Sequence, residues 1–523
     1  MNPRSLVFIL PVYVAFFASG AASLVAEVTW NRMLIVVVGN SLSATAMIIA
    51  VFMGGLGLGS WTGGRFLGPR RASLVPYVLL ESAIAVYVLL SPAIFDALAD
   101  LFRSLAAGPG DRDLLTLARV AVSLGALLLP ATLMGATFPA IVSGTVAGAP
   151  DRRTARTGYL YSINTIGAAL GCFAAGYHLL LELGVRFTLH VAFGLYALAA
   201  ACALLAHLVR SREKSAPVAA SAGTAAAAAG SGGSVAAPRD HAPRRFLAVA
   251  TFTVGFVALA YEVLLTRLAI LYLGNSVSVF PLVLTGFLLG TGLSAVVGTW
   301  AYGALLRAGR AAHALFGWLA LAAAVFAVLT PYLLLTDLVV DAGQFARFAD
   351  ATPRNPLPIL SIIIAPTALV GALLPVAIRM TRGERRAGTI RSAATLYALN
   401  TAGGLLGASV ANQFLVPWIG VQGTVSVLAG ALVAVAAAQW ARSGTGVAAA
   451  RWRPVSVAGI GGAAAAAVVA LALPGMMDLY AAKIAEGTGA RSTELHFLRE
   501  GRAATVTVLD QEDPARGTYR DMY

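Results

Sequence analysis

Apolar stretches long enough to cross a bilayer, about 20 residues each, recur from one end of this chain to the other. In the hydrocarbon core only α-helices and closed barrels satisfy their backbone hydrogen bonds. Charged residues make up 11% and hydrophobic residues 59% of the 523 positions, whereas soluble domains have about 25% and about 45–50%. The pattern therefore predicts an all-α polytopic membrane protein. It excludes a soluble enzyme, a disordered chain and a coiled coil.

Thirteen segments meet this criterion, so we expect about 12–13 transmembrane helices. They lie near residues 8–38, 42–66, 74–93, 114–145, 158–182, 187–208, 246–273, 277–304, 312–335, 357–380, 392–416, 420–440 and 455–474. Long loops on the outer side are expected at 94–113 and 336–356.

Basic residues indicate the orientation, because Lys and Arg concentrate in cytoplasmic loops. With the N-terminus inside, the cytoplasmic segments hold 23 of the 37 basic residues, and the opposite side with its helix ends holds eight. We therefore expect a cytoplasmic N-terminus. Thirteen spans place the C-terminal tail outside, and twelve would return it to the cytoplasm. The net charge of +14 thus reflects topology and not a nucleic-acid partner.

The chain contains two copies of one unit. A shift of 235 residues aligns Glu27 with Glu262 and makes 12 of the 34 positions from Glu27 to Ser60 identical. A shift of 236 aligns later positions, among them Asn164 with Asn400. Each copy has six spans, an even number, so the repeat is parallel, as in the two halves of major-facilitator transporters.

This repeat predicts five segments. They are a first six-helix repeat at 1–212, a flexible Ala/Gly/Ser linker at 213–243, a second six-helix repeat at 244–442, an extra transmembrane helix at 443–475 and a β-rich tail at 476–523.

Two charged pairs interrupt equivalent apolar stretches: Glu27 with Arg32, and Glu262 with Arg267. Charges at membrane depth are costly, so these residues are candidates for function. A spacing of five separates the side chains by about 140° on a helix, so we expect each to find a partner on another helix. Two roles stay open: a substrate or proton site between the halves, or an interhelical ion pair that joins them. The first helix is either long and tilted or broken after this pair.

Glu81 lies in the third span and has no counterpart, since the equivalent residue is Phe316. An unmatched acid suits an asymmetric role such as proton coupling. A buried, hydrogen-bonded carboxyl without such a role is the alternative.

A Tyr-x-x-Asn-Thr-x-Gly pattern occurs at 161–167 and at 397–403. It places Tyr161, Asn164, Tyr397 and Asn400 beside small residues, where Asn hydrogen-bonds across closely packed helices. Close packing is the favoured role, and a polar lining of a central cavity is the alternative.

No other motif indicates chemistry. Cys172 and Cys202 lie in apolar segments and form no disulfide framework. His178 and His190 lack metal-ligand spacing, and no triad, Walker loop or Rossmann fingerprint is present. The sequence therefore predicts no catalytic, cofactor or metal site.

Several stretches resemble a known family. Tyr261–Arg267, Leu273–Ser276 and Phe287–Gly290, together with Gly-Ala-x-x-Pro and Tyr-x-x-Asn-Thr in both copies, are similar to bacterial spermidine-synthase-like membrane proteins. These are also described as fused major-facilitator/spermidine-synthase proteins. The resemblance covers most of residues 10–440 and implies a multi-pass protein of the bacterial inner (plasma) membrane.

The tail is similar to the N-terminal β-hairpins of the aminopropyltransferase domain. Residues 504–509 alternate as a strand does, 510–517 look like a hairpin turn, and 518–523 start a further strand. A strand pair without a core is unstable, so we expect a truncated domain in a fragment of a longer protein. The resemblance implies transfer of an aminopropyl group from decarboxylated S-adenosylmethionine to putrescine, but no position here matches the residues for that reaction.

Three functions follow. The resemblance implies a membrane domain that anchors such a synthase and transports or presents a polyamine-like substrate or product. The residues also fit a stand-alone major-facilitator-like secondary transporter of a small solute, for which a cation is one candidate, with Glu27, Glu81 and Glu262 as site candidates. A non-transporting membrane scaffold is the third, which the duplicated acids disfavour.

Overall fold

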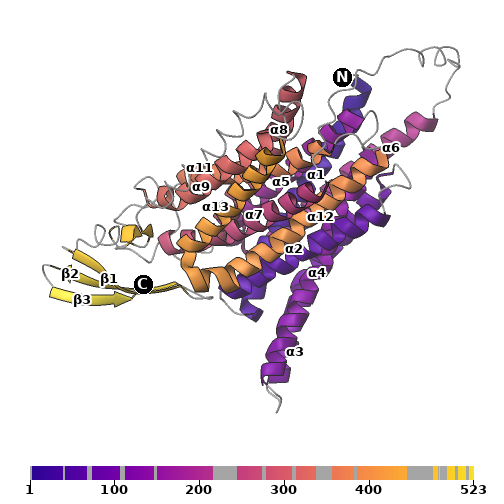
Figure 1. The fold of residues 1–523 in the computed structure, drawn as a ribbon. Helices are drawn as coiled ribbons and strands as arrows, with labels where there is room; N and C mark the ends of the chain where they lie inside the picture. Colours follow the sequence, from indigo (N-terminus) through magenta and orange to yellow (C-terminus); the bar gives the residue numbers. More distant parts are fainter. Residues whose placement is uncertain are drawn as a thin grey trace.

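A computed structural model shows a bundle of long, roughly parallel helices with a small sheet at one end (Figure 1). It describes residues 3–38, 42–66, 73–106, 112–145, 150–215, 244–273, 278–308, 314–336, 356–381, 386–443, 475–476, 478–480, 482, 492–500, 505–513 and 517–522. The predicted thirteenth span at 455–474 and nearly all of the predicted linker lie outside these residues.

Twelve long α-helices occur in the described ranges, six from each repeat. The first six are α1 (Pro3–Val38), α2 (Leu42–Phe66), α3 (Val75–Ala106), α4 (Arg112–Thr145), α5 (Pro150–Ala174) and α6 (Gly184–Ser215). The second six are α7 (Arg244–Leu273), α8 (Val279–Arg307), α9 (Ala314–Leu334), α11 (Leu357–Met380), α12 (Arg386–Val410) and α13 (Val416–Ser443). A π-helical segment follows α5 and another follows α12: η1 (Ala175–Leu183) and η2 (Ala411–Leu415).

Nine stretches of described helix are long and apolar enough to cross a membrane. Two of them, Tyr159–Ser211 and Thr395–Arg442, are 53 and 48 residues long, and each contains two helices joined at a bend. The chain is therefore a helical, multi-pass membrane protein, as the sequence predicted.

The bends are duplicated. Gly184 has φ 74° and Gly420 has φ 71°, in a region that only glycine adopts readily. The two glycines are equivalent under the repeat, and each follows a π-helical segment. Gly184 directly follows η1 at the start of α6, and Gly420 lies inside α13, shortly after η2, so in both repeats the bend is made at a glycine and no loop is present there.

The two repeats pack through α5 against α8 and through α2 against α12. These are the same pairing with the roles of the repeats exchanged. A Cβ added at Gly292 of α8 would lie 3.3 Å from Thr165 of α5. In the other pairing, a Cβ at the equivalent glycine, Gly57 of α2, would lie 2.9 Å from the equivalent threonine, Thr401 of α12. The interface therefore has pseudo-twofold symmetry, the arrangement expected of a parallel repeat.

Within each repeat, glycines bring two helices into backbone contact. Gly167 of α5 lies against the Phe17 carbonyl of α1, and its equivalent Gly403 of α12 lies against the Phe252 carbonyl of α7. Small residues promote such contacts because lipid supplies no hydrophobic force between helices. The Tyr-x-x-Asn-Thr-x-Gly pattern ends on these two glycines.

The structure decides between the two alternatives left open for α1, and α3 differs from the sequence prediction. α1 is continuous from Pro3 to Val38, so the first span is long and does not break after Glu27. α3 continues to Ala106, whereas the prediction placed a loop from residue 94. The prediction stopped where apolar residues stop, but a helix can extend past the membrane edge. There Asp100 and Arg103 form an exposed ion pair of 2.7 Å.

The C-terminal residues form three antiparallel strands in the order β1-β2-β3. They are β1 (Ser492–Glu500), β2 (Thr505–Asp513) and β3 (Gly517–Met522), and the sheet lies near α13, away from the N-terminus (Figure 1). β2 extends through residues predicted as a turn. No comparison supports reading these strands as the start of a synthase domain.

Replacing Gly167 with Ala should destabilise the protein, because its Cβ would collide with the Phe17 carbonyl. Overpacking of this kind costs about 1–3 kcal/mol. Gly403→Ala should cost about the same. Gly194→Ala in α6 is the matched control, since a Cβ there meets nothing within 4 Å. The measurement is melting temperature in detergent, and equal values for Gly167→Ala and Gly194→Ala would contradict the close contact.

Candidate functional site

Glu27 of α1 and Glu262 of α7 come from opposite repeats and face one interface. Each side chain is 4% exposed, and the two carboxyl groups lie within electrostatic range of each other. Equivalent positions near a pseudo-twofold axis necessarily approach each other, so the duplication itself explains why two acids meet. An approach of two acids in an apolar bundle is costly unless something compensates their charge.

Neither carboxyl forms an ion pair with a basic residue anywhere in the described part of the chain. Glu27 Oε2 is buried without a hydrogen-bond partner. Arg32 is exposed, whereas Arg267 is buried and its Nη1 donates to Asn412 Oδ1 at 3.5 Å. The interhelical Glu–Arg pair considered from the sequence is therefore not formed by these residues.

Other polar groups surround the acid pair. Asn31 follows Glu27 by one helical turn on the same face. It is 7% exposed, and its Oδ1 has no hydrogen-bond partner. Cys172 of α5 lies within electrostatic range of both acids, and its Sγ donates to the Pro281 carbonyl of α8 at 3.5 Å. This side of the interface can therefore offer anionic and neutral oxygens to a ligand.

The π-helical segments adjoin this region. η1 begins three residues after Cys172, and η2 begins at the residue before Asn412. A π-helical segment widens the turn and is frequent at functional sites. The two π-helical segments begin at equivalent positions in the two repeats. The distortion is therefore a property of the repeated unit, and local packing in one repeat does not explain it.

The two predicted tyrosines also meet across the interface. Phe138 of α4 stacks on Tyr397 with ring centroids 6.0 Å apart, and it lies edge-on to Tyr161 at 6.3 Å. Asn164 Nδ2 donates to the Phe16 carbonyl of α1 at 2.9 Å. The backbone carbonyl of Asn164 lies against Gly20 of α1. In the second repeat the backbone carbonyl of Asn400 lies against the equivalent glycine, Gly255 of α7.

Glu81 is buried inside the first repeat, away from the acid pair. Its side chain is 0% exposed. Ser19 Oγ of α1 donates to its Oε1 at 2.7 Å, and its Oε2 has no hydrogen-bond partner. Tyr77 lies beside it on α3, and its hydroxyl donates to the Ala15 carbonyl at 3.3 Å. The unmatched acid is thus joined to the helix that carries Glu27.

Sequence reasoning missed Asn31, Asn412, Ser19, Phe138 and Tyr196 of α6, which lies within electrostatic range of Glu81 and Glu27. Asn31 and Ser19 lie four and eight residues from Glu27, so helical spacing marks both in the sequence. The other three come from distant helices, and only packing brings them here. Cys202 and the histidines stand apart; His178 lies 3.5 Å from exposed Glu182. Among the described residues no group of three His, Cys, Asp or Glu could hold a metal.

Comparison with known proteins identifies the fold. The sequence matches no protein-family profile and no curated protein. Solved structures do match. An outward-facing bacterial homologue of the iron transporter ferroportin, soaked with iron, is 14% identical, covers 85% of this chain and 100% of its own, and has a TM-score of 0.51. A peptide transporter, POT, in complex with sulfate is 13% identical, with coverages of 83% and 94% and a TM-score of 0.51.

At such identity these similarities establish the fold alone. The chain has the fold of major-facilitator-type transporters, in agreement with the parallel six-helix repeats.

The resemblance to spermidine-synthase-like proteins is wrong, and so is the function based on it. The similar structures are transporters, and no comparison supports an aminopropyltransferase or polyamine specificity. The motifs behind the resemblance include Gly135, Gly371 and Asn164, which form helix contacts. Small residues at such contacts serve any tightly packed membrane bundle. They are therefore weak markers of a particular family.

Replacing Glu27 or Glu262 with Gln should raise the melting temperature in mildly alkaline detergent solution. Gln has nearly the same shape but removes an uncompensated buried charge, a change expected to stabilise by about 1–3 kcal/mol. The double variant should gain less than the sum, because the first substitution already removes the repulsion. Glu182→Gln, at an exposed acid, is the control. A lower melting temperature in both single variants would indicate a hidden partner for the acids.

Proposed function

We propose that this protein is a secondary transporter of major-facilitator type and that it carries a small, positively charged solute between its two repeats. The observation that carries the proposal is the pair Glu27 and Glu262. These acids are buried at the interface, within electrostatic range of each other, and have no ion pair in the described chain.

The charge arrangement favours a cation over other solutes. Two carboxylates repel an anion, and a neutral solute would leave their charge uncompensated. A cation placed between them would interact with both acids, and the unpartnered Asn31 Oδ1 would add a neutral acceptor. A scaffold would have no use for acids at this cost, which favours transport over a purely structural role.

The interface also supports a transport cycle. In transporters built from repeats, the two halves rock around a site at their interface. The contacts of α5 with α8 and of α2 with α12 include close approaches of glycine to threonine, and residues this small allow the helices to separate and make contact again. In this proposal the solute site opens as one of these pairings loosens.

The protein belongs in a bilayer, and its basic loops support an N-terminus on the cytoplasmic side. We propose a bacterial plasma membrane as its location. The extracytoplasmic position of the C-terminal tail stays a prediction.

Transport can be tested in proteoliposomes that contain the purified protein. Radiolabelled methylammonium, tetraethylammonium and choline are the cationic probes, and lactate is the anionic control. We expect exchange of at least one cation and none of lactate. Glu27→Gln and Glu262→Gln should each reduce exchange about tenfold or more, since a charged hydrogen-bonding partner is lost. Glu182→Gln should have no effect. Exchange of lactate, or cation exchange that survives both interface substitutions, would overturn the cationic site.

Rocking can be tested with a reversible cross-link between α2 and α12. A Cβ at Gly57 would lie 3.6 Å from the Thr401 Cβ, within the range of disulfides. We expect oxidation of the double variant Gly57→Cys/Thr401→Cys to stop exchange and reduction to restore it. Each single variant, oxidised in the same way, is the control and accounts for Cys172 and Cys202. Full exchange by the cross-linked protein would contradict movement at this pairing.

A further inference from the structure

Polar side chains form a ladder along α1. Ser19, Ser23, Glu27 and Asn31 are spaced four residues apart in a largely apolar helix. Residues at this spacing lie one above another on one face. Three of the four side chains are buried, and Ser23 is partly buried. Buried polar groups in a membrane helix are costly, so a continuous row of them needs an explanation.

Glu81 of α3 contacts Ser19, the first residue of this ladder. Ser19 Oγ donates to Glu81 Oε1 at 2.7 Å. The titratable groups around Glu81 are Tyr77 on its own helix and Tyr196 on α6, and no basic residue pairs with it in the described chain.

Tyr196 hydrogen-bonds to the middle of the ladder, at Ser23. Its hydroxyl and Ser23 Oγ are 2.9 Å apart. Ser23 Oγ already donates to the Ser19 carbonyl at 2.9 Å, so Tyr196 is the donor in the bond between the two hydroxyls. Tyr196 is also within electrostatic range of Glu81 and of Glu27. Hydroxyl groups therefore lie along the space between the two carboxyls.

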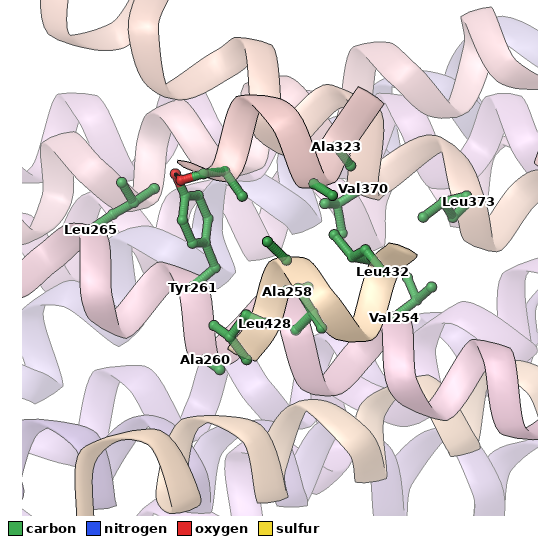
Figure 2. Close-up of a cluster of buried hydrophobic side chains, with 14 of the residues drawn as sticks. Val254, Ala258, Ala260, Tyr261, Leu265, Ala323, Val370, Leu373, Leu428 and Leu432 are labelled. Carbon is green, nitrogen blue, oxygen red and sulfur yellow. Dashed lines mark hydrogen bonds between the residues drawn. The ribbon is translucent and has the colours of Figure 1, made fainter. Parts of the chain in front are cut away.

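The described part of the second repeat contains no such set of hydrogen-bonded polar side chains, although its backbone packs in the same way. The residues equivalent to Ser19, Ser23 and Tyr196 are Val254, Ala258 and Leu432, all buried in one apolar cluster, and α9, the counterpart of α3, contains no acidic residue. Figure 2 shows Val254, Ala258 and Leu432 among the apolar side chains of this cluster. The fold is thus built at these three positions from hydrocarbon alone, and packing does not account for the polar set in the first repeat.

We propose that Glu81 is a proton-binding site that exchanges a proton with Glu27 along this ladder, which makes the first repeat the proton-coupled half. The proton leaves the Glu27 carboxyl and is passed on by the hydroxyls of Tyr196, Ser23 and Ser19, each of which accepts one proton and gives up its own. This is the direction in which Tyr196 donates to Ser23 and Ser19 donates to Glu81, and Ser23 Oγ turns from the Ser19 carbonyl to the Ser19 hydroxyl for the transfer. The proton ends on the Glu81 carboxylate and the hydroxyls are left unchanged; the reverse transfer requires each hydroxyl to rotate.

The effect of this proton exchange on transport rests on the proposed function. A protonated Glu27 has no charge with which to hold a cation, so proton and solute compete for it. The coupling is then an exchange of protons for cations in opposite directions. Glu262 lacks a ladder and keeps its charge through the step.

Proton binding can be tested without any solute. Difference infrared spectroscopy of the reconstituted full-length protein, between acidic and alkaline buffer, reports the C=O stretch of protonated carboxyl groups. We expect Glu81→Gln to remove one such band and Tyr196→Phe to shift it. Tyr261→Phe is the matched control, because it removes a buried hydroxyl of the second repeat that donates to the Ala327 carbonyl at 3.0 Å. A spectrum of Glu81→Gln identical to that of the unmodified protein would overturn the proposal.

Coupling is tested with the cation that exchanges in proteoliposomes. We expect Glu81→Gln and Ser19→Ala to retain exchange at equal pH but to lose about tenfold or more of the accumulation driven by a pH gradient, since a proton relay is interrupted. Undiminished accumulation in Glu81→Gln would refute the coupling. No exchange of any probe by the unmodified protein would instead count against the proposed function, and the infrared result would still decide whether Glu81 binds a proton.

Discussion

Backbone contact between helices, made possible by glycine, is the interaction on which this structure depends. Gly167 brings α5 onto α1, and Gly403 brings α12 onto α7 in the same way. In a bilayer no hydrophobic force drives helices together, so close van der Waals contact has to do so. α5 and α12 in turn form the interface between the repeats, through α8 and α2. The positions of α1 and α7, and of the acids they carry, follow from these contacts.

Duplication accounts for both the symmetry and the cost of the central site. Because Glu27 and Glu262 occupy equivalent positions near a pseudo-twofold axis, two like charges approach each other. A protein selected for stability alone would lose one of them, since a buried charge is expensive without a partner. Their presence without an ion pair in the described chain is therefore best explained by a charge that arrives from outside.

Asymmetry is confined to a few side chains. The repeats share their π-helical segments and the two glycines with positive φ, yet Ser19 and Tyr196 have apolar equivalents in the second repeat, and α9 has no acid to match Glu81. The same backbone can thus hold either set. This separation lets one repeat acquire a chemical role while the other keeps the packing, because the glycine contacts that define the fold lie elsewhere on the helices.

The sequence by itself determined the class of structure and the duplication. Hydrophobic length fixes membrane helices, and aligned residues such as Glu27 and Glu262 or Gly184 and Gly420 fix the repeat. It also marked Glu81 as unmatched. It misled where short packing motifs were taken as family markers, because close helix contacts need the same small residues in unrelated proteins. Only the tertiary structure decided that the acids meet without Arg32 or Arg267, that Tyr161 and Tyr397 share Phe138, and that Tyr196 joins Ser23. Those partners are far apart in the chain, and their contacts depend on how the helices pack.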